Sequence, residues 1–132
     1  MSDMPRDLPA MQLGYSRTEL RRRLVDAVLQ GEKTATSSLR SEYAPYTDES
    51  LPEIGERRTM HDFDDRAVAV VETVEVRVLR VGEIDLAFAR DEGEGFETVE
   101  NWRRAHEQFW AGHEIRDDTL VVAERFKVVE RL

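Results

Sequence analysis

The alternating stretch from Ala67 to Val78, AVAVVETVEVRV, constrains the fold of this chain more than any other feature. Side chains alternate between the two faces of a strand, so valines at nearly every second position from 68 to 78 share one face. Glu72 is the only charged residue on that face. Either a bulge turns it to the opposite face, or it lies where a pocket meets the core. The stretch predicts one long strand.

The remaining periodic segments predict helices and further strands around this one. Their order is helix, strand, long loop, hairpin, two helices and strand, which indicates an α+β fold. About five to six strands, flanked by two to three helices, would form a small β-barrel, because closure removes exposed sheet edges. The expected helices cover 16–30, 84–89 and 99–110, and the expected strands cover 34–39, 57–63, 67–78 and 119–132.

A chain of 132 residues predicts one domain, which we place at 15–132. Residues 1–14 contain two prolines and no period, and we expect an N-terminal arm there. The chain has no cysteine and no apolar run of about 20 residues, and nothing in it resembles a signal peptide. We therefore expect a soluble, cytoplasmic protein that has no membrane partner.

The net charge of −9 limits the nucleic acids that this protein could bind. Non-specific binding to long nucleic acid depends on counterion release and needs a basic face. We expect no binding to a long duplex. A nucleoside, or a short RNA held in a local basic pocket, remains compatible with the charge.

The segment Gly31 to Thr36, GEKTAT, predicts a sharp corner between a helix and a strand. If the strand is extended, Thr34, Thr36 and Ser38 share one face, with Lys33 beside them at the corner. A row of hydroxyls beside a lysine could bind a ligand. From this segment alone, however, a polar edge strand with a solvated lysine is the favoured interpretation.

Two loops add further candidate binding residues. Ser41 to Gly55 is long and irregular, which is typical of lids and binding loops. Its Tyr43 and Tyr46 could stack on a planar ligand or fasten the loop to the core. The second loop follows the short helix and holds three carboxylates in the segment DEGEG, at 91–95.

The familiar metal and phosphate motifs are incomplete in this sequence. His106 and Glu107 begin like a zinc-protease helix, but Trp110 stands where the second histidine would be. The acidic turn at 62–65 lacks the glycine and the glutamate of a calcium loop. With no phosphate loop, no cysteine and three scattered histidines, we expect neither a metal nor a cofactor.

The segment LVDAVLQGEKTATSSL, at 24–39, resembles the signature of ASCH-domain proteins, a PUA-like β-barrel superfamily proposed to act on RNA. The motif Gly-x-Lys-x-x-Thr is matched by Gly31, Lys33 and Thr36. The resemblance extends over roughly 15–132. It includes LPEIG at 51–55, EGEG at 92–95, the helix around Trp102, and VVAERF at 121–126.

This resemblance implies a PUA-like barrel and two classes of function. One branch of the family is similar to small amidohydrolases that deacetylate N4-acetylcytidine, and its motif carries over to Lys33, Thr36 and Glu94 as catalytic residues. Other members resemble RNA-binding proteins, and ribonuclease activity has been proposed for some. Arg40 comes later here than the arginine of the amidohydrolase branch, and the lid loop is longer, which leaves the substrate open.

The two classes predict different roles for the same residues. In the enzyme, Lys33 would activate the Thr36 hydroxyl, and Glu94 would orient the lysine or carry the proton. In the binding module, Lys33 and Arg40 would contact a phosphate. The remaining candidate binding residues are Ser38, Tyr43, Glu72 and Trp102, with Tyr43 or Trp102 stacking on a base.

Both classes require Lys33, Thr36 and either Glu72 or Glu94 to converge in one concave site. We expect the loop from Ser41 to Gly55 to cover it. A lysine partly withdrawn from water needs a partner of opposite charge, which is the reason to expect a carboxylate beside it.

Overall fold

The computed structural model describes residues 8–11 and 13–132, and its core is a four-stranded antiparallel sheet. The strands lie in the order β1-β4-β3-β2. Their bounds are Ala35–Leu39 for β1, Arg57–His61 for β2, Ala67–Arg80 for β3 and Leu120–Arg131 for β4. Each was expected from the sequence to within a few residues.

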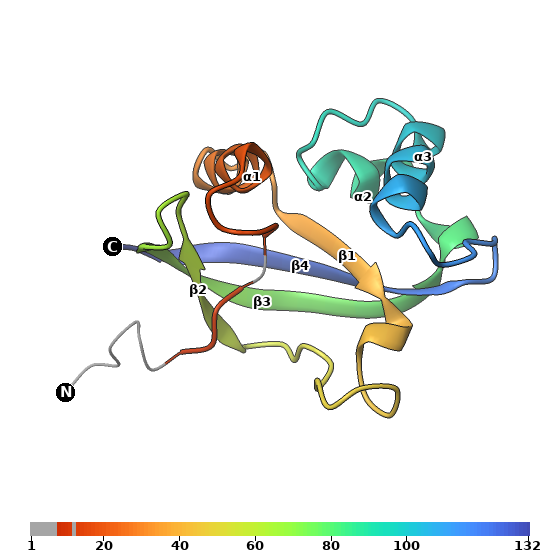
Figure 1. Ribbon diagram of the computed structural model, residues 1–132, viewed down its shortest axis with the longest axis horizontal. Coiled ribbons are helices and arrows are strands. Elements are labelled where there is room, and N and C mark those ends of the chain that lie inside the picture. Colours follow the sequence, from red (N-terminus) through yellow and green to blue (C-terminus); the bar gives the residue numbers. More distant parts are fainter. Residues whose placement is uncertain (1–7, 12) are drawn as a thin grey trace.

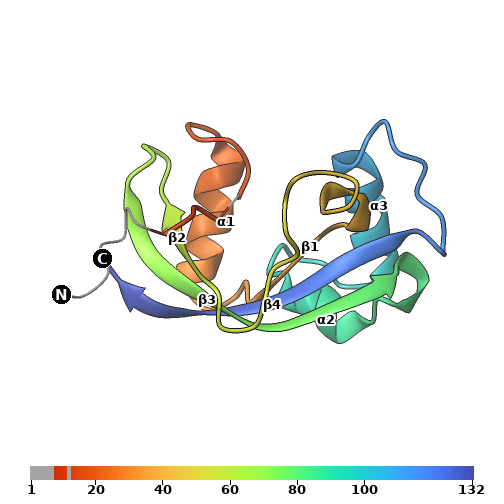
Figure 2. The same ribbon diagram turned by 90° about the horizontal axis from the view of Figure 1, so that it is seen from below.

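The two long strands β3 and β4 form a twisted ribbon along the whole molecule (Figure 2). Irregular pairing between Val70 and Val71, and again between Thr73 and Glu75, marks bulges that increase the twist of β3. The predicted α+β class is confirmed. The sheet is a curled half-barrel of four strands among the described residues, fewer than the five to six expected.

Three helices lie above the sheet in the view of Figure 1. They are α1 (Glu19–Leu29), α2 (Leu86–Asp91) and α3 (Val99–Phe109). Thr98 caps α3 by accepting a hydrogen bond from the Asn101 N–H. Thr18 caps α1 in the same way, by accepting from the Arg21 N–H.

Alternate residues of β4 supply two separate hydrophobic cores. Val121 and Ala123 belong to the core beneath α2 and α3, whereas Phe126 packs in the core beneath α1. Neighbouring strand residues point to opposite faces, so the ribbon contributes one local face to each core. Its twist explains how both cores can lie on the same side of the molecule in Figure 1.

The start of the chain pairs with the outer edge of β2. Ala10 and Thr59 form an isolated parallel bridge, and Met11 and Leu13 are buried in the core beneath α1. Most of the arm expected over 1–14 lies at 1–7 and 12, outside the described residues. The remainder packs on the domain.

In the view of Figure 1 the segment between β1 and β2 lies below the strands, whereas the helices lie above them. It begins with the 3-10 helix η2 (Arg40–Glu42), and a second one, η3 (Val81–Glu83), joins β3 to α2. Among the described residues, no helix combines the length and the apolar character that crossing a membrane requires.

Candidate functional site

Lys33 lies at the corner between α1 and β1, as the sequence predicts. Gly31 follows the helix with φ +80°, a conformation that suits glycine. The Lys33 N–H donates to the Ala27 carbonyl at 3.0 Å, and the Thr34 N–H donates to the Asp91 carbonyl at 2.8 Å. The corner is therefore fixed by main-chain bonds to α1 and to the end of α2.

The Lys33 ammonium group is almost completely buried, with 2% of the residue exposed, so the alternative of a solvated lysine is excluded. Its three donors meet three acceptors: the Ala35 carbonyl at 2.9 Å, the Glu92 carbonyl at 3.0 Å and Glu94 Oε2 at 3.3 Å. Glu92 Oε1 lies 3.9 Å away. The side chain of Glu94 is 30% exposed, so it is the accessible partner of the lysine.

Gly93 allows the acidic loop to reach the lysine. It has φ +70°, and a Cβ at this position would lie 2.5 Å from the Glu32 carbonyl oxygen and 2.5 Å from Lys33 Cα. Any larger residue would push the loop away from the corner. The glycine thus places Glu92 and Glu94 on either side of the ammonium group.

Glu92 is the centre of a buried hydrogen-bond network. Its Oε2 accepts from Trp102 Nε1 at 2.6 Å and from Ser37 Oγ at 2.8 Å. Its Oε1 lies 3.4 Å from His106 Nε2. The Nδ1 of His106 donates to the Trp102 carbonyl at 2.8 Å, and its ring stacks on the Trp102 indole with centroids 4.3 Å apart.

The charge of Glu92 is well supported despite its burial. Burial by itself would raise the pKa of this carboxyl group. The hydrogen bond from His106, the positive charge of Lys33 and the bond from Trp102 outweigh burial and bring the pKa below its usual range. Glu92 is therefore ionised at neutral pH and pairs with the lysine in the interior.

A cleft of about 280 Å³ lies between α1 and the acidic loop, and Glu94, the partner of Lys33, is among the residues that line it. Arg23 is the basic residue among those that line it, and Asp26, Glu32 and Glu94 are the acidic ones. The mouth nearest Lys33 is thus acidic. A negative field repels a chain of phosphates more than it repels a neutral ligand.

Thr36 and Ser38 lie on the other face of β1, away from the Glu92 network. Ser38 Oγ is 2.6 Å from the Tyr43 hydroxyl, so Tyr43 holds the long loop against this face. Thr36 pairs with Glu124 of β4. Among the described residues, the Thr36 hydroxyl forms no hydrogen bond and does not reach the Lys33 amine.

A second buried polar cluster surrounds Glu124 on this face. Glu124 Oε2 accepts from Thr73 Oγ1 at 2.7 Å and pairs with the Arg58 guanidinium group. Arg58 Nε is buried and has no hydrogen-bond partner among the described residues. Burial raises the pKa of the nearby Tyr43 phenol, its hydrogen bond to Ser38 lowers it, and the charge of Glu124 raises it further.

Three other candidate residues have structural partners of their own. Glu72 Oε1 accepts from Arg57 Nε at 3.0 Å on β2, far along the sheet from Lys33, so Glu94 and not Glu72 contacts the lysine. Trp102 is fully buried and offers no face to a ligand. Arg40 donates to the Ala44 carbonyl at 2.9 Å and lies 5.8 Å from the Tyr46 ring centroid.

The sequence analysis did not single out Glu92, Ser37 or Glu124 as site residues. Ser37 was detectable, because it is a hydroxyl between Ala35 and Leu39 on the core face of β1. Glu124 stands among the apolar residues of β4 in the same way. No local signal separates Glu92 from Glu94, since the difference depends on how the loop turns at Gly93.

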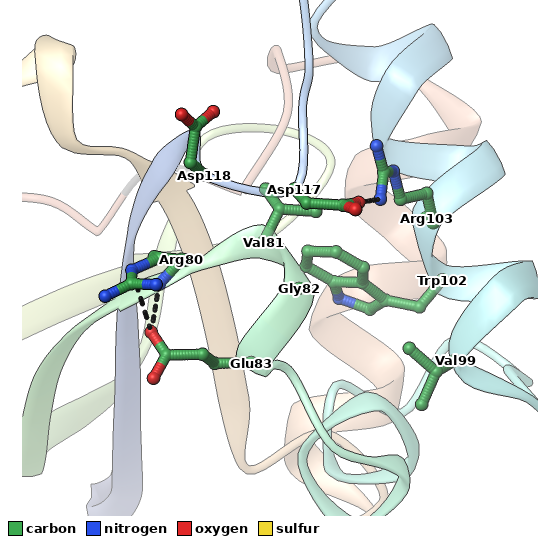
Figure 3. Close-up of a pocket in the computed structure, with 9 residues that line it drawn as sticks. All are labelled: Arg80, Val81, Gly82, Glu83, Val99, Trp102, Arg103, Asp117 and Asp118. Carbon is green, nitrogen blue, oxygen red and sulfur yellow. Dashed lines mark hydrogen bonds and ion pairs between the residues drawn. The ribbon is translucent and has the colours of Figure 1, made fainter.

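A second cleft, of about 520 Å³, lies elsewhere, between η3 and α3 (Figure 3). Figure 3 shows four of its charged side chains in two pairs, Arg80 with Glu83 and Arg103 with Asp117, and Asp118 apart from them. None of the candidate residues except the covered Trp102 lines this cleft. Within the described part of the chain, no three His, Cys, Asp or Glu side chains are placed to hold a metal ion.

Comparison with known proteins agrees with this architecture. The family model of the ASCH domain matches residues 10–130. A crystal structure of an ASCH domain from Lactobacillus crispatus JV V101 is 32% identical, with a TM-score of 0.74 over 82% of this chain and 71% of that one. Protein EF3133 from Enterococcus faecalis V583 is 26% identical, with a TM-score of 0.75 over 95% and 82% of the two chains. No curated protein matches the sequence. The match over nearly the whole length shows that this chain belongs to the ASCH-domain family.

Proposed function

We propose that this ASCH domain binds a nucleoside, with the base held between Lys33 and Glu94. The observation that carries the proposal is the arrangement of the Lys33 donors. Two of its acceptors are main-chain carbonyls, and the third is the partly exposed carboxylate of Glu94. An acceptor atom of a ligand can replace Glu94 on the lysine without disturbing the other two bonds.

Cytosine fits this pair of groups in hydrogen-bonding character. Its carbonyl oxygen would accept from the Lys33 ammonium group, and its exocyclic amine would donate to the displaced Glu94 carboxylate. The acidic mouth of the neighbouring cleft, with Asp26 and Glu32, favours a neutral nucleoside over a phosphate chain.

Amide hydrolysis of an N4-acetylcytidine-like substrate is the finer form of this proposal. Lys33 would hold the acyl oxygen while the Thr36 hydroxyl attacks the acyl carbon. Glu94 would take the hydroxyl proton and give it to the leaving cytosine amine, and water would then hydrolyse the acetyl-Thr36 ester to release acetate. Thr36 has no competing hydrogen bond among the described residues. The attack nevertheless requires the substrate to reach around the outer edge of β1 to the face that carries Thr36.

Binding of short single-stranded RNA, with or without cleavage, is the second candidate. Arg40 and Tyr46 in the long loop favour it, because a guanidinium group beside an exposed ring is suited to a phosphate and a stacked base. In that case affinity depends on phosphate contacts. It should then fall steeply with added salt, whereas nucleoside affinity should change little.

Calorimetric titration of the wild type with cytidine, N4-acetylcytidine and a short RNA tests both candidates. We expect Glu94→Gln to weaken nucleoside binding roughly tenfold or more, since it loses a charge-assisted hydrogen bond. Glu97→Gln, in the same loop, is the matched control and should bind normally. If neither nucleoside binds to the wild type, the nucleoside proposal fails, and the salt dependence of RNA binding then decides the second candidate.

Acetate release from N4-acetylcytidine tests the hydrolytic step separately. We expect Thr36→Val to abolish turnover while leaving nucleoside binding intact. Lys33→Ala is a poor choice here, because it leaves Glu92 buried without its main positive partner and so destabilises the fold. Turnover that persists in Thr36→Val would remove Thr36 as the nucleophile.

A further inference from the structure

The outer edge of β3 is unpaired over half of the strand. β2 pairs with β3 only as far as Glu72, and the Gly55 N–H then bonds to the Thr73 carbonyl. At the other end, the Arg80 N–H donates to Glu83 Oε1 at 2.8 Å. Between these two points, no main chain in the described part of the protein pairs with the edge. Figure 2 shows β3 at the rim of the sheet, beyond β1 and β4.

The hydrogen-bonding groups on this edge can be assigned from the pairing with β4. The Val81 N–H donates inward, to the Thr119 carbonyl at 2.8 Å. Main-chain groups alternate along a strand, so Glu75 and Arg77 face β4, whereas Val76 and Val78 direct their N–H and C=O groups outward. An open edge of this kind is a template for another strand.

The side chains along the edge are accessible on both faces of β3. Val74 and Val78 are 40% and 44% exposed, which is unusual for valines of a central ribbon. On the other face, the side chains of Glu75 and Arg77 are 44% and 42% exposed and lie 3.3 Å apart, and Glu75 Oε1 is also 3.3 Å from Arg125 Nε of β4. The edge therefore offers a valine stripe on one face and an acid–base pair on the other.

This arrangement is self-complementary when two copies pair antiparallel about Val76. Val76 then lies opposite its own counterpart, and Val74 lies opposite the Val78 of the second copy. Glu75 lies opposite the second copy's Arg77, and Arg77 opposite its Glu75. Moving the centre by one residue would place Glu75 or Arg77 opposite itself, so the charges select one register.

We propose that the free edge of β3, from Val74 to Val78, is a homodimer interface in which two copies of this chain form one continuous eight-stranded sheet about a two-fold axis at Val76. The outward main-chain groups of Val76 and Val78 form the inter-chain hydrogen bonds. The partner strand comes from a second copy of this chain, because antiparallel pairing of the edge with itself places Glu75 and Arg77 of the two copies opposite each other.

Sedimentation velocity over a wide range of protein concentrations tests the interface. We expect a concentration-dependent dimer in the wild type. Glu75→Arg and Arg77→Glu each create like-charge pairs across the axis, and each should raise the dimer dissociation constant about tenfold or more. The double variant restores opposite charges, and its dissociation constant should return to within about threefold of the wild-type value.

Val76→Pro tests the same interface without changing any charge. It removes an outward N–H while leaving the pairing with β4 intact, and it should abolish the dimer. Arg104→Glu, on the exposed face of α3, is the control and should dimerise normally. Circular dichroism confirms that each variant is folded. A wild type that stays monomeric at high concentration, or a dimer that none of the edge variants weakens, would overturn the proposal.

Discussion

Two buried polar clusters lie on opposite faces of β1 and β4, one around Glu92 and the other around Glu124. Glu92 accepts hydrogen bonds from Ser37 and Trp102, and its other carboxylate oxygen lies close to His106 and Lys33. Glu124 accepts hydrogen bonds from Arg58 and Thr73. In its cluster, Arg58 Nε is buried without a hydrogen bond to any described residue and lies 3.8 Å from Glu56 Oε2.

The difference lies in how completely each carboxylate is enclosed. Glu92 is fully buried, and Lys33, Trp102 and His106 are buried with it, whereas the Arg58 side chain remains 16% exposed. A closed network holds the corner of Lys33 in place. A cluster with a spare donor and access to solvent can rearrange when one member is removed.

Removal of the charge of Glu92 should have the largest effect. Glu92→Gln leaves Lys33 buried without its interior counter-charge and should lower the free energy of unfolding by about 3–5 kcal/mol. Urea unfolding at neutral pH measures this loss. Glu94→Gln is the matched control, and because Glu94 is partly exposed it should cost about 1 kcal/mol or less. Equal losses in the two variants would contradict the closed network.

Acidification should gradually remove the contribution of the Glu92 charge to the free energy of unfolding. The pKa of Glu92 lies below its ordinary value in the folded protein, so the unfolded chain binds more protons than the folded one as the pH falls below about 4.3. Glu92 therefore stabilises the fold at neutral pH, and this stabilisation is lost as the pH falls through the lowered pKa. Urea unfolding of the wild type and Glu92→Gln should show a gap that narrows toward about pH 3. A constant gap would mean that the Glu92 charge is not its cause.

Removal of Glu124 should have a smaller effect. Glu124→Gln weakens its bonds to Arg58 and Thr73, but water can reach the guanidinium group from the loop side, so we expect a loss of roughly 1.5–3 kcal/mol. Glu130→Gln, at the exposed end of the same strand, should leave the free energy of unfolding unchanged. A loss as large as that of Glu92→Gln would show that the two clusters are equally closed.

Neighbouring hydroxyls on β1 provide the finest comparison. Ser37→Ala removes a donor to buried Glu92 and should cost about 1 kcal/mol. Thr36→Val keeps the shape of a side chain with no hydrogen bond among the described residues, and its effect should stay within about 0.5 kcal/mol. Thermal unfolding of the two variants resolves the difference. The reverse order would mean that Thr36, not Ser37, is tied into the fold.

Local patterns were sufficient to predict the secondary structure. The alternation from Ala67 to Val78 located β3, and the glycine after α1 located the corner at Lys33. The number of strands was overestimated, because periodicity does not reveal whether a sheet closes. Closure depends on the twist that the two bulges of β3 introduce.

The sequence predicted the candidate site only where local geometry, such as the strand face of a residue, determines the position of its side chain. Glu94 beside Lys33 agrees with the expectation that a buried lysine needs a carboxylate partner. The separation of Thr36 from the lysine follows from strand alternation, but the burial of the ammonium group on the side of Ser37 depends on tertiary contacts. The role of Glu92 depends on a loop conformation that only Gly93 permits.

The bond from Lys33 to the Ala35 carbonyl bears on whether the protein can polymerise. The Thr34 carbonyl accepts from Phe126 of β4, so the Ala35 carbonyl points to the outer edge of β1, where Lys33 occupies it. Glu42 likewise occupies the outward Leu39 N–H at 2.6 Å. A sheet in which both edge strands have unpaired main-chain groups could extend from molecule to molecule into a fibre. With the β1 edge obstructed, association through β3 ends at two copies.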